Sequence, residues 1–365
     1  MKNTFGNNIT ITLFGESHGE AIGCVLDGMA PGIKVDEDAI ERMMELRKPK
    51  GKISTSRHEP DKAKIVSGVY NGYTTGTPIC IVIENTNTHS GDYAKLNIIP
   101  RPGHADLTAG LKYHGFQDYR GGGHFSGRIT APIVAAGAIV MEALNKKGIY
   151  VGTHISSIGE IKDRDFADYV SDIEGLYDKE FPVLDDETED KMRAYIEAAA
   201  AEGDSVGGIL KTAVVGCPGG IGEPWFDSVE SMLSHALFSI PAVKGVQFGG
   251  GFALAGMHGS EANDSFRMAG NKVVTATNHN GGINGGITNE MPIEFSVAIK
   301  PTPSIYKEQD SVDLDKKENT RLKIEGRHDP AIIHRARIVV DAITAITLAD
   351  LLVTHYGTDY LCNTD

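Results

Sequence analysis

Two short segments of the chain combine histidine with glycine in a way that could serve acid–base chemistry. The first reads Gly15-Glu16-Ser17-His18-Gly19 and directly follows an apolar stretch that alternates as a β-strand would. The second reads Arg101-Pro102-Gly103-His104 and places its histidine after a Pro-Gly turn. An imidazole titrates near neutral pH, so it can donate a proton to a leaving group or stabilise an anion. His18 and His104 are therefore candidate catalytic residues.

The first segment also matches Gly-x-Ser-x-Gly, the nucleophile elbow of serine hydrolases. In that elbow the serine is followed by a helix, whereas here Gly23, Gly28 and Pro31 follow soon after Ser17 and disfavour a helix. A serine hydrolase is thus disfavoured, although one motif of this kind does not decide the question. The other alternative is a turn histidine whose hydrogen bonds are satisfied by the backbone.

A run of three glycines at residues 121–123 precedes an Ala-rich segment and is followed by Ser126 and Arg128. Backbone amides at the start of a helix bind anions readily, and glycine leaves them uncrowded. The run has neither the Gly-Lys-Ser/Thr of a Walker loop nor the spacing of a dinucleotide fingerprint, so it predicts an anion site without identifying the anion. Histidines recur every ten residues from His104 to His124, which fits no helical face, and no zinc centre is predicted.

Three segments nearer the C-terminus could also approach a ligand. The glycines of residues 278–287 would let the backbone come close to a flat or phosphorylated molecule, and a β-hairpin or bulge is the alternative interpretation. Residues 300–304 form a stiff cationic turn that begins at Lys300. Asp329 precedes Pro330 at the expected start of a long helix, where it could also serve only as an N-cap.

Composition limits the partners of such a site. The 365 residues carry a formal net charge of -14, which argues against a nucleic acid or an anionic membrane as partner. An anionic small molecule would therefore need a local cluster of cations. The four cysteines form no CxxC pair, and residues 1–15 lack the pattern of a secretory signal. The longest uninterrupted apolar run, residues 131–141, is about half a membrane span. We expect a cytoplasmic protein.

The elements that would position these residues alternate between strands and helices. Apolar patterns bounded by Gly, Pro or Asn predict strands at residues 9–14, 23–26, 65–70, 79–84, 151–156, 209–215, 245–248 and 293–299. Start and stop signals predict helices that begin at Asp36 and that span residues 130–147, 185–201, 226–240 and 330–356. Strands also occur in neighbouring runs, so we predict an α+β fold with antiparallel sheets packed against helices. Without a linker or an internal repeat, a single domain over residues 1–365 is expected.

Taken in order, these segments resemble the chorismate synthase family along nearly the whole chain. The blocks that carry the resemblance are GESHG at 15–19, TTGTPI at 74–79, IENT at 83–86, RPGHAD at 101–106, DYRGGG at 118–123, GDSVGG at 203–208, AVKGV at 242–246, NGGINGGI at 280–287, KPTPS at 300–304 and GRHDP at 326–330. Several such blocks in one order are far more specific than any single motif. The resemblance implies a β-α-β sandwich in one domain and a homotetramer.

The resemblance also implies a lyase of the shikimate pathway, which supplies aromatic amino acids. Its substrate, a phosphorylated dicarboxylate named 5-enolpyruvylshikimate 3-phosphate, would lose phosphate and a proton in a 1,4-anti elimination to give chorismate. The cofactor would be reduced FMN, which can lend electron density to the substrate and recover it without net redox change. NAD(P)H would serve only indirectly, as a source of electrons for the flavin.

Roles for individual residues follow from the same resemblance. His18 would act as acid or cationic partner to the departing phosphate, His104 would stabilise the reduced flavin, and Asp329 would relay a proton. Ser17 and Ser126 would orient groups or pass protons. Flavin contacts would come from His124, Phe125, Ser126, Ala242, Gly285, Lys300, Pro301, Thr302, Pro303, Ser304 and Arg327. Substrate contacts would come from cations, which a phosphate and two carboxylates require: Arg47, Lys52, Arg57, Arg101, Arg128 and Arg327.

The chain departs from the family pattern in three places, one of which is Pro241, where the family often has Asn. His124 and Phe125 stand where the family has Arg and Ser, and Lys48, Lys50 and Lys52 fall in a stretch that is rich in Arg in the family. Lysine keeps the charge but not the bidentate geometry of arginine. A divergent flavin-binding paralogue and a flavin reductase are therefore the alternatives to a chorismate synthase.

Overall fold

The computed structural model describes residues 2–51, 53–54, 61–86, 96–324, 326 and 328–362 of the chain. Its first sheet has five antiparallel strands in the order β1-β2-β3-β7-β4. They span Thr4–Phe5 (β1), Thr10–Gly15 (β2), Ala21–Asp27 (β3), Ile79–Glu84 (β7) and Lys64–Ser67 (β4). Gly15 pairs with Ile22 at the end of the β2-β3 hairpin, so Ser17 and His18 lie in its turn.

The second sheet also has five antiparallel strands, in the order β11-β16-β10-β8-β9. They span Val243–Phe248 (β11), Ile293–Ile299 (β16), Gly208–Val215 (β10), Tyr150–Ile158 (β8) and Ile161–Lys162 (β9). Val243 pairs with Ile299, which brings Ala242 beside Lys300, and the Lys300 N–H donates to the Ala242 carbonyl at 2.9 Å. Two of the segments that the sequence singles out therefore meet at one edge of this sheet.

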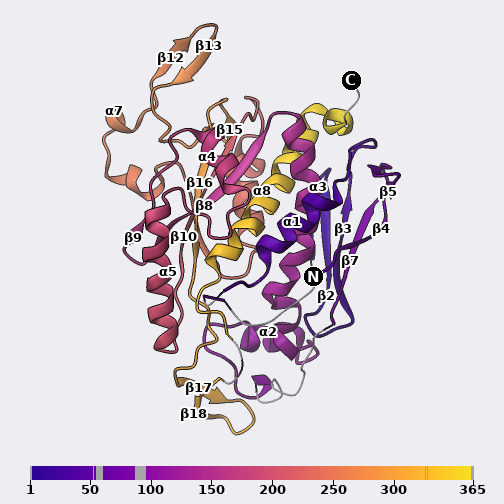
Figure 1. The fold of residues 1–365 in the computed structure, drawn as a ribbon, viewed down its shortest axis with the longest axis vertical. Coiled ribbons are helices and arrows are strands. Elements are labelled where there is room, and N and C mark those ends of the chain that lie inside the picture. Colours follow the sequence, from indigo (N-terminus) through magenta and orange to yellow (C-terminus); the bar gives the residue numbers. More distant parts are fainter. Residues whose placement is uncertain are drawn as a thin grey trace.

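Two long helices, α3 (Thr130–Lys146) and α8 (Ile333–Tyr356), lie between the sheets (Figure 1). Helix α3 packs on β3 and β7, helix α8 packs on β8 and β10, and the helices pack on each other. Both are buried almost all round, as expected of helices that are apolar on every face. The predicted α+β fold and its β-α-β sandwich are confirmed. Residues 127–146 are long and apolar enough to cross a membrane, but 83% of the apolar window is buried inside the protein, as in a core helix.

The remaining α-helices of the described residues are α1 (Glu37–Arg47), α2 (Asp106–Tyr113), α4 (Tyr169–Leu176), α5 (Asp186–Ala201), α6 (Val229–Leu237) and the short α7 (Gly259–Ala262). Among them, α1 packs on both central helices, α6 packs on α8, and α4 packs on β8 of the second sheet. Asp36 and Asp185 cap α1 and α5 by accepting backbone N–H groups, in agreement with the predicted starts. Helix α1 packs on α3, so its last residue, Arg47, comes close to the segment that precedes α3.

Three predicted boundaries are wrong for identifiable reasons. Helix α8 begins at Ile333 instead of Pro330, because the Pro330 carbonyl accepts the Val206 N–H at 2.8 Å and ties this segment to another loop. The helix predicted over residues 226–240 is shorter, since Ser228 caps α6 by accepting the Ser231 N–H. The strand predicted over residues 65–70 is broken at Gly68, which has φ +83.

The described residues also form four two-stranded hairpins. They are β5-β6 (Val69–Tyr70 and Tyr73–Thr74), β12-β13 (Phe266–Ala269 and Lys272–Thr275), β14-β15 (Ile283–Asn284 and Ile287–Thr288) and β17-β18 (Gln309–Asp313 and Glu318–Leu322). Hairpins β12-β13 and β17-β18 project from opposite ends of the molecule (Figure 1). Short 3-10 turns lie at Trp225–Asp227, Gly251–Gly256 and Thr358–Leu361.

A buried carboxylate on α8 anchors the segment that leads into β2. Asp350 is 1% exposed and accepts the backbone N–H groups of Asn7, Asn8 and Ile9 at 2.9, 2.7 and 2.9 Å. Hydrogen bonds to a charged acceptor are stronger than neutral ones. Because β2 ends in the turn that carries Ser17 and His18, this contact joins the last helix to the candidate site.

Replacing this carboxylate tests the importance of the anchor. We expect Asp350→Asn to lower the free energy of unfolding by about 2–4 kcal/mol, because all three N–H groups would lose their charged acceptor and at least one would face an amide NH₂ group. Urea unfolding measures the change. Asp359→Asn, at an exposed position near the end of the same helix, should change the free energy of unfolding by less than about 0.5 kcal/mol. Equal effects of the two substitutions would contradict the anchor.

Candidate active site

The turn between β2 and β3 presents two polar side chains that are nearly buried. Ser17 is 6% exposed and His18 is 9% exposed. Ser17 Oγ lies 3.0 Å from His18 Nδ1 and 3.1 Å from the carbonyl oxygen of Gly121. Asn85 donates from its side-chain amide to the carbonyls of Glu16 and Gly19, which fixes the turn. The strand that follows, β3, replaces the helix of a hydrolase elbow, so the hydrolase alternative is not supported.

The glycine run at 121–123 is a left-handed loop between the two candidate histidines. Its φ values are +61, +86 and +53, a region that residues with side chains rarely adopt. A Cβ atom at Gly121 would lie 2.0 Å from His18 Cε1, and one at Gly122 would lie 3.3 Å from His104 Cε1. Only glycine therefore lets this backbone pass between the imidazoles. The loop forms part of the 3-10 segment Arg120–Phe125, which a second 3-10 turn, Gly127–Ile129, connects to α3.

His104 is held by a carboxylate from its own segment, and a guanidinium lies beside it. Its Nδ1 atom lies 2.6 Å from Asp106 Oδ1 and 3.0 Å from Arg101 Nη2. Arg101 makes a side-on pair with Asp106, with Nε and Nη2 each 2.8 Å from a carboxylate oxygen. Burial opposes ionisation of Asp106, but the hydrogen bonds from Arg101 and His104 outweigh it and hold the pKa of this carboxyl well below its usual range.

Residues 300–304 pack directly on this histidine segment. Lys300 Nζ donates to the Gly103 carbonyl, and Ser304 Oγ accepts from Arg101 Nη1 at 3.2 Å. Burial, together with the charge of Lys244, lowers the pKa of Lys300. The structure therefore brings the predicted cationic turn and the predicted catalytic His104 into one cluster.

Asp329 is connected to the 300–304 turn through an intervening loop. Its carboxylate is 3.2 Å from Arg335 Nη1 at the start of α8. The following residue, Pro330, accepts the Val206 N–H, while the neighbouring Ser205 Oγ donates to the Thr302 carbonyl at 2.7 Å. Loop 203–208 thus links Asp329 to the 300–304 turn.

The residues that replace the family's Arg and Ser have defined contacts. His124 Nδ1 donates to the Gly15 carbonyl at 2.8 Å, so its ring ties the glycine loop to the end of β2. The Phe125 ring meets the Tyr113 ring edge-on with 6.0 Å between centroids and is 38% exposed. Ser126 Oγ accepts the Arg128 N–H at 3.3 Å.

Two of the predicted substrate cations converge on a single carboxylate. Arg47 Nη1 lies 2.9 Å from one oxygen of Asp61, and Arg128 Nη1 lies 2.5 Å from the other. The Asp61 side chain is 1% exposed, and those of Arg47 and Arg128 are 6% and 9% exposed. Arg47 also donates to the hydroxyl of Thr130 and to the carbonyls of Gly127 and Arg128. This guanidinium is therefore held rigidly. Three further predicted cations, Lys52, Arg57 and Arg327, lie outside the described residues.

Two predicted flavin contacts belong to the second sheet and its surroundings. Ala242 has φ +74 and sits beside Lys300, inside the cluster described above. Gly285 forms the two-residue turn of β14-β15 together with Gly286, which packs against Ser228. The structure therefore joins Ala242 to the cluster, whereas the Gly285–Gly286 turn packs against a different part of the chain, at Ser228.

Three site residues were not singled out from the sequence: Asp61, Asn85 and Asp106. Asn85 and Asp106 belong to the IENT and RPGHAD blocks. A carboxylate two residues after a histidine, with an arginine three residues before it, was a signal that could have identified Asp106. Asp61 gave no such signal, because its partners are 14 and 67 residues away.

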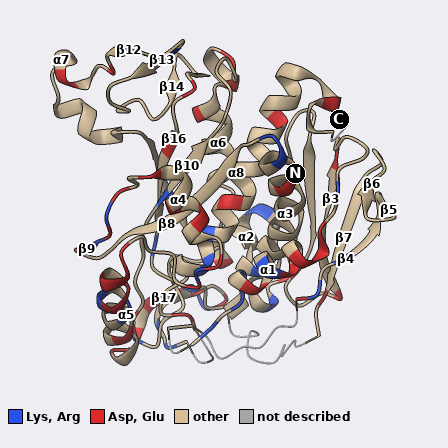
Figure 2. Ribbon diagram, turned by 45° about the horizontal axis from the view of Figure 1, so that its top comes forward, with Lys and Arg blue, Asp and Glu red and all other residues tan. Residues whose placement is uncertain are grey.

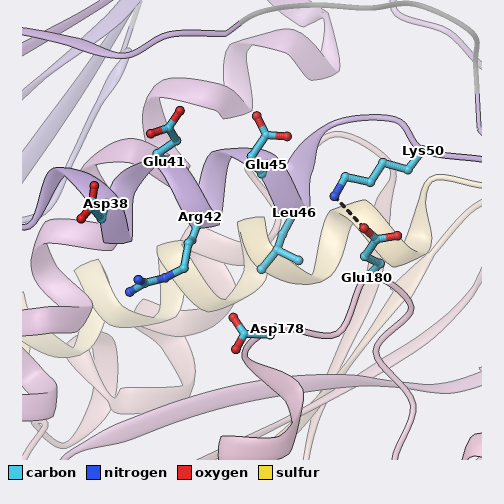
Figure 3. Close-up of a pocket in the computed structure, with 8 residues that line it drawn as sticks. All are labelled: Asp38, Glu41, Arg42, Glu45, Leu46, Lys50, Asp178 and Glu180. Carbon is cyan, nitrogen blue, oxygen red and sulfur yellow. Dashed lines mark hydrogen bonds and ion pairs between the residues drawn. The ribbon is translucent and has the colours of Figure 1, made fainter.

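Two grooves flank α1 and differ in charge from the histidine cluster. One, of about 520 Å³, runs between α1 and the loop at residues 178–180. Its lining includes five carboxylates, of Asp38, Glu41, Glu45, Asp178 and Glu180, against two cations, Arg42 and Lys50 (Figure 3). The other, of about 850 Å³, lies between α1 and the strands β4 and β7 and reaches Asp61. Figure 2 shows basic positions near α1 and α2 in an otherwise acidic protein. An anionic substrate fits the histidine cluster better than the acidic groove of Figure 3.

Comparison with known proteins decides the family. A family model described as chorismate synthase matches residues 9–353. The chain belongs to the chorismate synthase family. A chorismate synthase of Pyrococcus abyssi is 46% identical over 349 residues, with 95% of this chain and 97% of the relative covered. One from Dehalococcoides mccartyi is 45% identical over 357 residues, with 96% of each covered. A crystal structure of chorismate synthase matches with a TM-score of 0.76 at 28% identity, covering 96% of this chain and 94% of that one.

The family fixes the reaction. The protein is a lyase that eliminates phosphate from 5-enolpyruvylshikimate 3-phosphate to give chorismate, a step of the shikimate pathway toward aromatic amino acids. Chorismate synthases use a reduced flavin. The resemblance identified from the sequence blocks is confirmed, and the alternatives of a paralogue with another function or a flavin reductase are not supported.

The glycine loop provides a direct test of the site. We expect Gly121→Ala to reduce turnover by at least about 10²-fold, because the new Cβ would displace the His18 ring, and small misplacements of reacting groups can cost that much. Steady-state phosphate release measures the effect. Gly115→Ala is the matched control, since Gly115 has φ +82 and no atom within 4 Å of its added Cβ. Similar losses in both variants would mean that backbone strain alone is responsible.

Proposed function

We propose that His18 and His104, on either side of the 121–123 loop, form the reaction centre of this chorismate synthase. The observation that carries the proposal is the glycine backbone with positive φ, where a Cβ at Gly121 would collide with the His18 ring and one at Gly122 would press on the His104 ring. His18 donates a proton or presents its cation to the departing phosphate. Ser17, 3.0 Å from the His18 ring, orients it, and Ser126 passes protons at the same loop.

We propose that the flavin is FMN, held against the 300–304 turn. Thr302 Oγ1 is buried and has no hydrogen-bond partner among the described residues, so a ligand would satisfy it. The half-exposed Phe125 ring offers an apolar face, and Lys300 offers a positive charge. The other contacts would come from His124, Ser126, Ala242, Gly285, Pro301, Pro303, Ser304 and Arg327. When bound, a reduced flavin lends electron density to the substrate and recovers it.

Side chains of the protein would stabilise negative charge and transfer protons around the flavin and the substrate. His104, positioned by Asp106, would stabilise negative charge on the flavin. Asp329 would relay a proton away from the flavin edge, supported by its link to the 300–304 turn through loop 203–208. Both carboxylates of the substrate and its phosphate would meet fixed cations, drawn from Arg47, Lys52, Arg57, Arg101, Arg128 and Arg327.

We infer that electrons reach the flavin from an external reductant, with NAD(P)H serving only indirectly, because the sequence has no nicotinamide-binding fingerprint. We further infer a cytoplasmic enzyme of one domain over residues 1–365. The net charge of -14 and the separated cysteines support this location.

A homotetramer is the proposed assembly. The projecting part of the chain around β12-β13 exposes large apolar side chains, including Phe252 at 86%, Phe266 at 73% and Met268 at 67%. Apolar groups gathered on a projection are typical of surfaces that other subunits cover. Light scattering on the purified protein would reveal the mass of the assembly.

Phosphate release under anaerobic conditions tests the proposed cofactor and its supply. We expect release from 5-enolpyruvylshikimate 3-phosphate when reduced FMN is supplied, without any nicotinamide. Oxidised FMN should not support it. Oxidation of a nicotinamide without phosphate release would instead favour a reductase.

Substitution of the first histidine tests its role. We expect His18→Ala to bind FMN but to turn over at least about 10²-fold more slowly, which is typical of losing a general acid. Flavin fluorescence and phosphate release measure the two properties. His355→Ala, at an exposed position near the end of α8, should behave as the parent. Unchanged turnover in His18→Ala would remove His18 from the mechanism.

A further inference from the structure

Asp106 is the first residue of α2, and its carboxylate faces back toward the segment that precedes the helix. It accepts the backbone N–H of Arg101 at 3.0 Å, Arg101 Nε and Nη2 at 2.8 Å each, and His104 Nδ1 at 2.6 Å. Its side chain is 11% exposed. All four contacts converge on one carboxylate that is nearly shielded from water.

The chemistry of the partners decides which nitrogen of His104 carries hydrogen. An ionised carboxylate only accepts hydrogen bonds, whereas a guanidinium only donates them, and both lie close to Nδ1. The Asp106 contact is the shorter, at 2.6 Å against 3.0 Å for Arg101. A lone pair on Nδ1 would face a negative oxygen at that distance, so Nδ1 must carry the hydrogen and donate it to Asp106.

The opposite nitrogen is then the one presented to the reaction centre. A Cβ atom added at Gly122 would lie 3.4 Å from His104 Nε2. Nε2 therefore faces the glycine loop, on whose other side the His18 ring lies against Gly121.

We propose that Asp106 is a positioning residue that fixes His104 with its hydrogen on Nδ1 and its Nε2 toward the glycine loop, and that Arg101 holds Asp106 in place. The proposal rests on the proposed function only in taking Nε2 as the working atom. Arg101 is 8% exposed and is also bonded to Ser304. Arg101 therefore connects Ser304 of the 300–304 turn to Asp106, which in turn binds His104.

The parent protein offers the first test. Nitrogen-15 NMR of the His104 ring, assigned with a His104→Gln variant, shows which nitrogen carries hydrogen at a pH where the ring is neutral. We expect Nδ1–H in the protein without flavin. A neutral ring with hydrogen on Nε2 and a bare Nδ1 would overturn the proposal without any variant of Asp106.

The Asp106→Asn variant offers the second test. Without the carboxylate, Arg101 Nη2 is the nearest charged neighbour of Nδ1, and it can only donate, so we expect the hydrogen to move to Nε2. Turnover should fall by at least about 10²-fold, as when the orienting carboxylate of a catalytic histidine is removed in serine proteases. An unchanged tautomer with turnover within about threefold of the parent would refute the positioning role.

A second His–Asp pair supplies the matched control. His154 Nδ1 lies 2.8 Å from Asp163, and both side chains are fully buried at a distance in sequence from the site. Asp163→Asn should lower stability without changing the His104 tautomer or the ratio of kcat to KM among folded molecules. If Asp106→Asn switches the tautomer but leaves turnover intact, the positioning of His104 stands and the proposed role of His104 in the reaction fails.

Discussion

The site depends on one steric constraint: backbone must pass between two imidazole rings. Glycines at 121 and 122 meet it because they have no side chains and adopt positive φ. The elements around the loop position the two rings and the loop itself. The β2-β3 hairpin brings His18 from one side, and the segment before α2 brings His104 from the other. Helix α3, buried between the sheets, fixes the end of the loop.

Buried carboxylates pair with the cations of the candidate site in the protein without substrate. Asp61 lies between Arg47 and Arg128, and Asp106 lies between Arg101 and His104. Each carboxylate offsets the charge of the arginine beside it and fixes the directions of its partners, which lowers the cost of ordering them around a ligand. A protein with a net charge of -14 can thus hold local guanidinium groups in fixed directions, as the binding of an anionic ligand requires.

Much of this arrangement could be predicted from the sequence, and the exceptions have physical reasons. Strand and helix patterns identified most strands of the two sheets and the two central helices, but not the short edge strands β1 and β9, and the ordered blocks identified the family. The start of α8 was wrong because a distant backbone contact at Pro330 overrides a favourable N1 residue. Asp61 was missed because burial and long-range pairing leave no local pattern. Arg101 could be recognised as a cation, but only coordinates show that Asp106 and Ser304 engage its guanidinium.

The Asp350 anchor also has a consequence for folding during synthesis, because it joins α8 to the segment that leads into β2. The carboxylate is 341 to 343 residues away in sequence from the N–H groups that it binds. A nascent chain on the ribosome therefore carries both histidines long before the strand that orients one of them can be secured. Chains that stop short of α8 lack this contact, so the segment that leads into β2 can be anchored only after α8 has been synthesised.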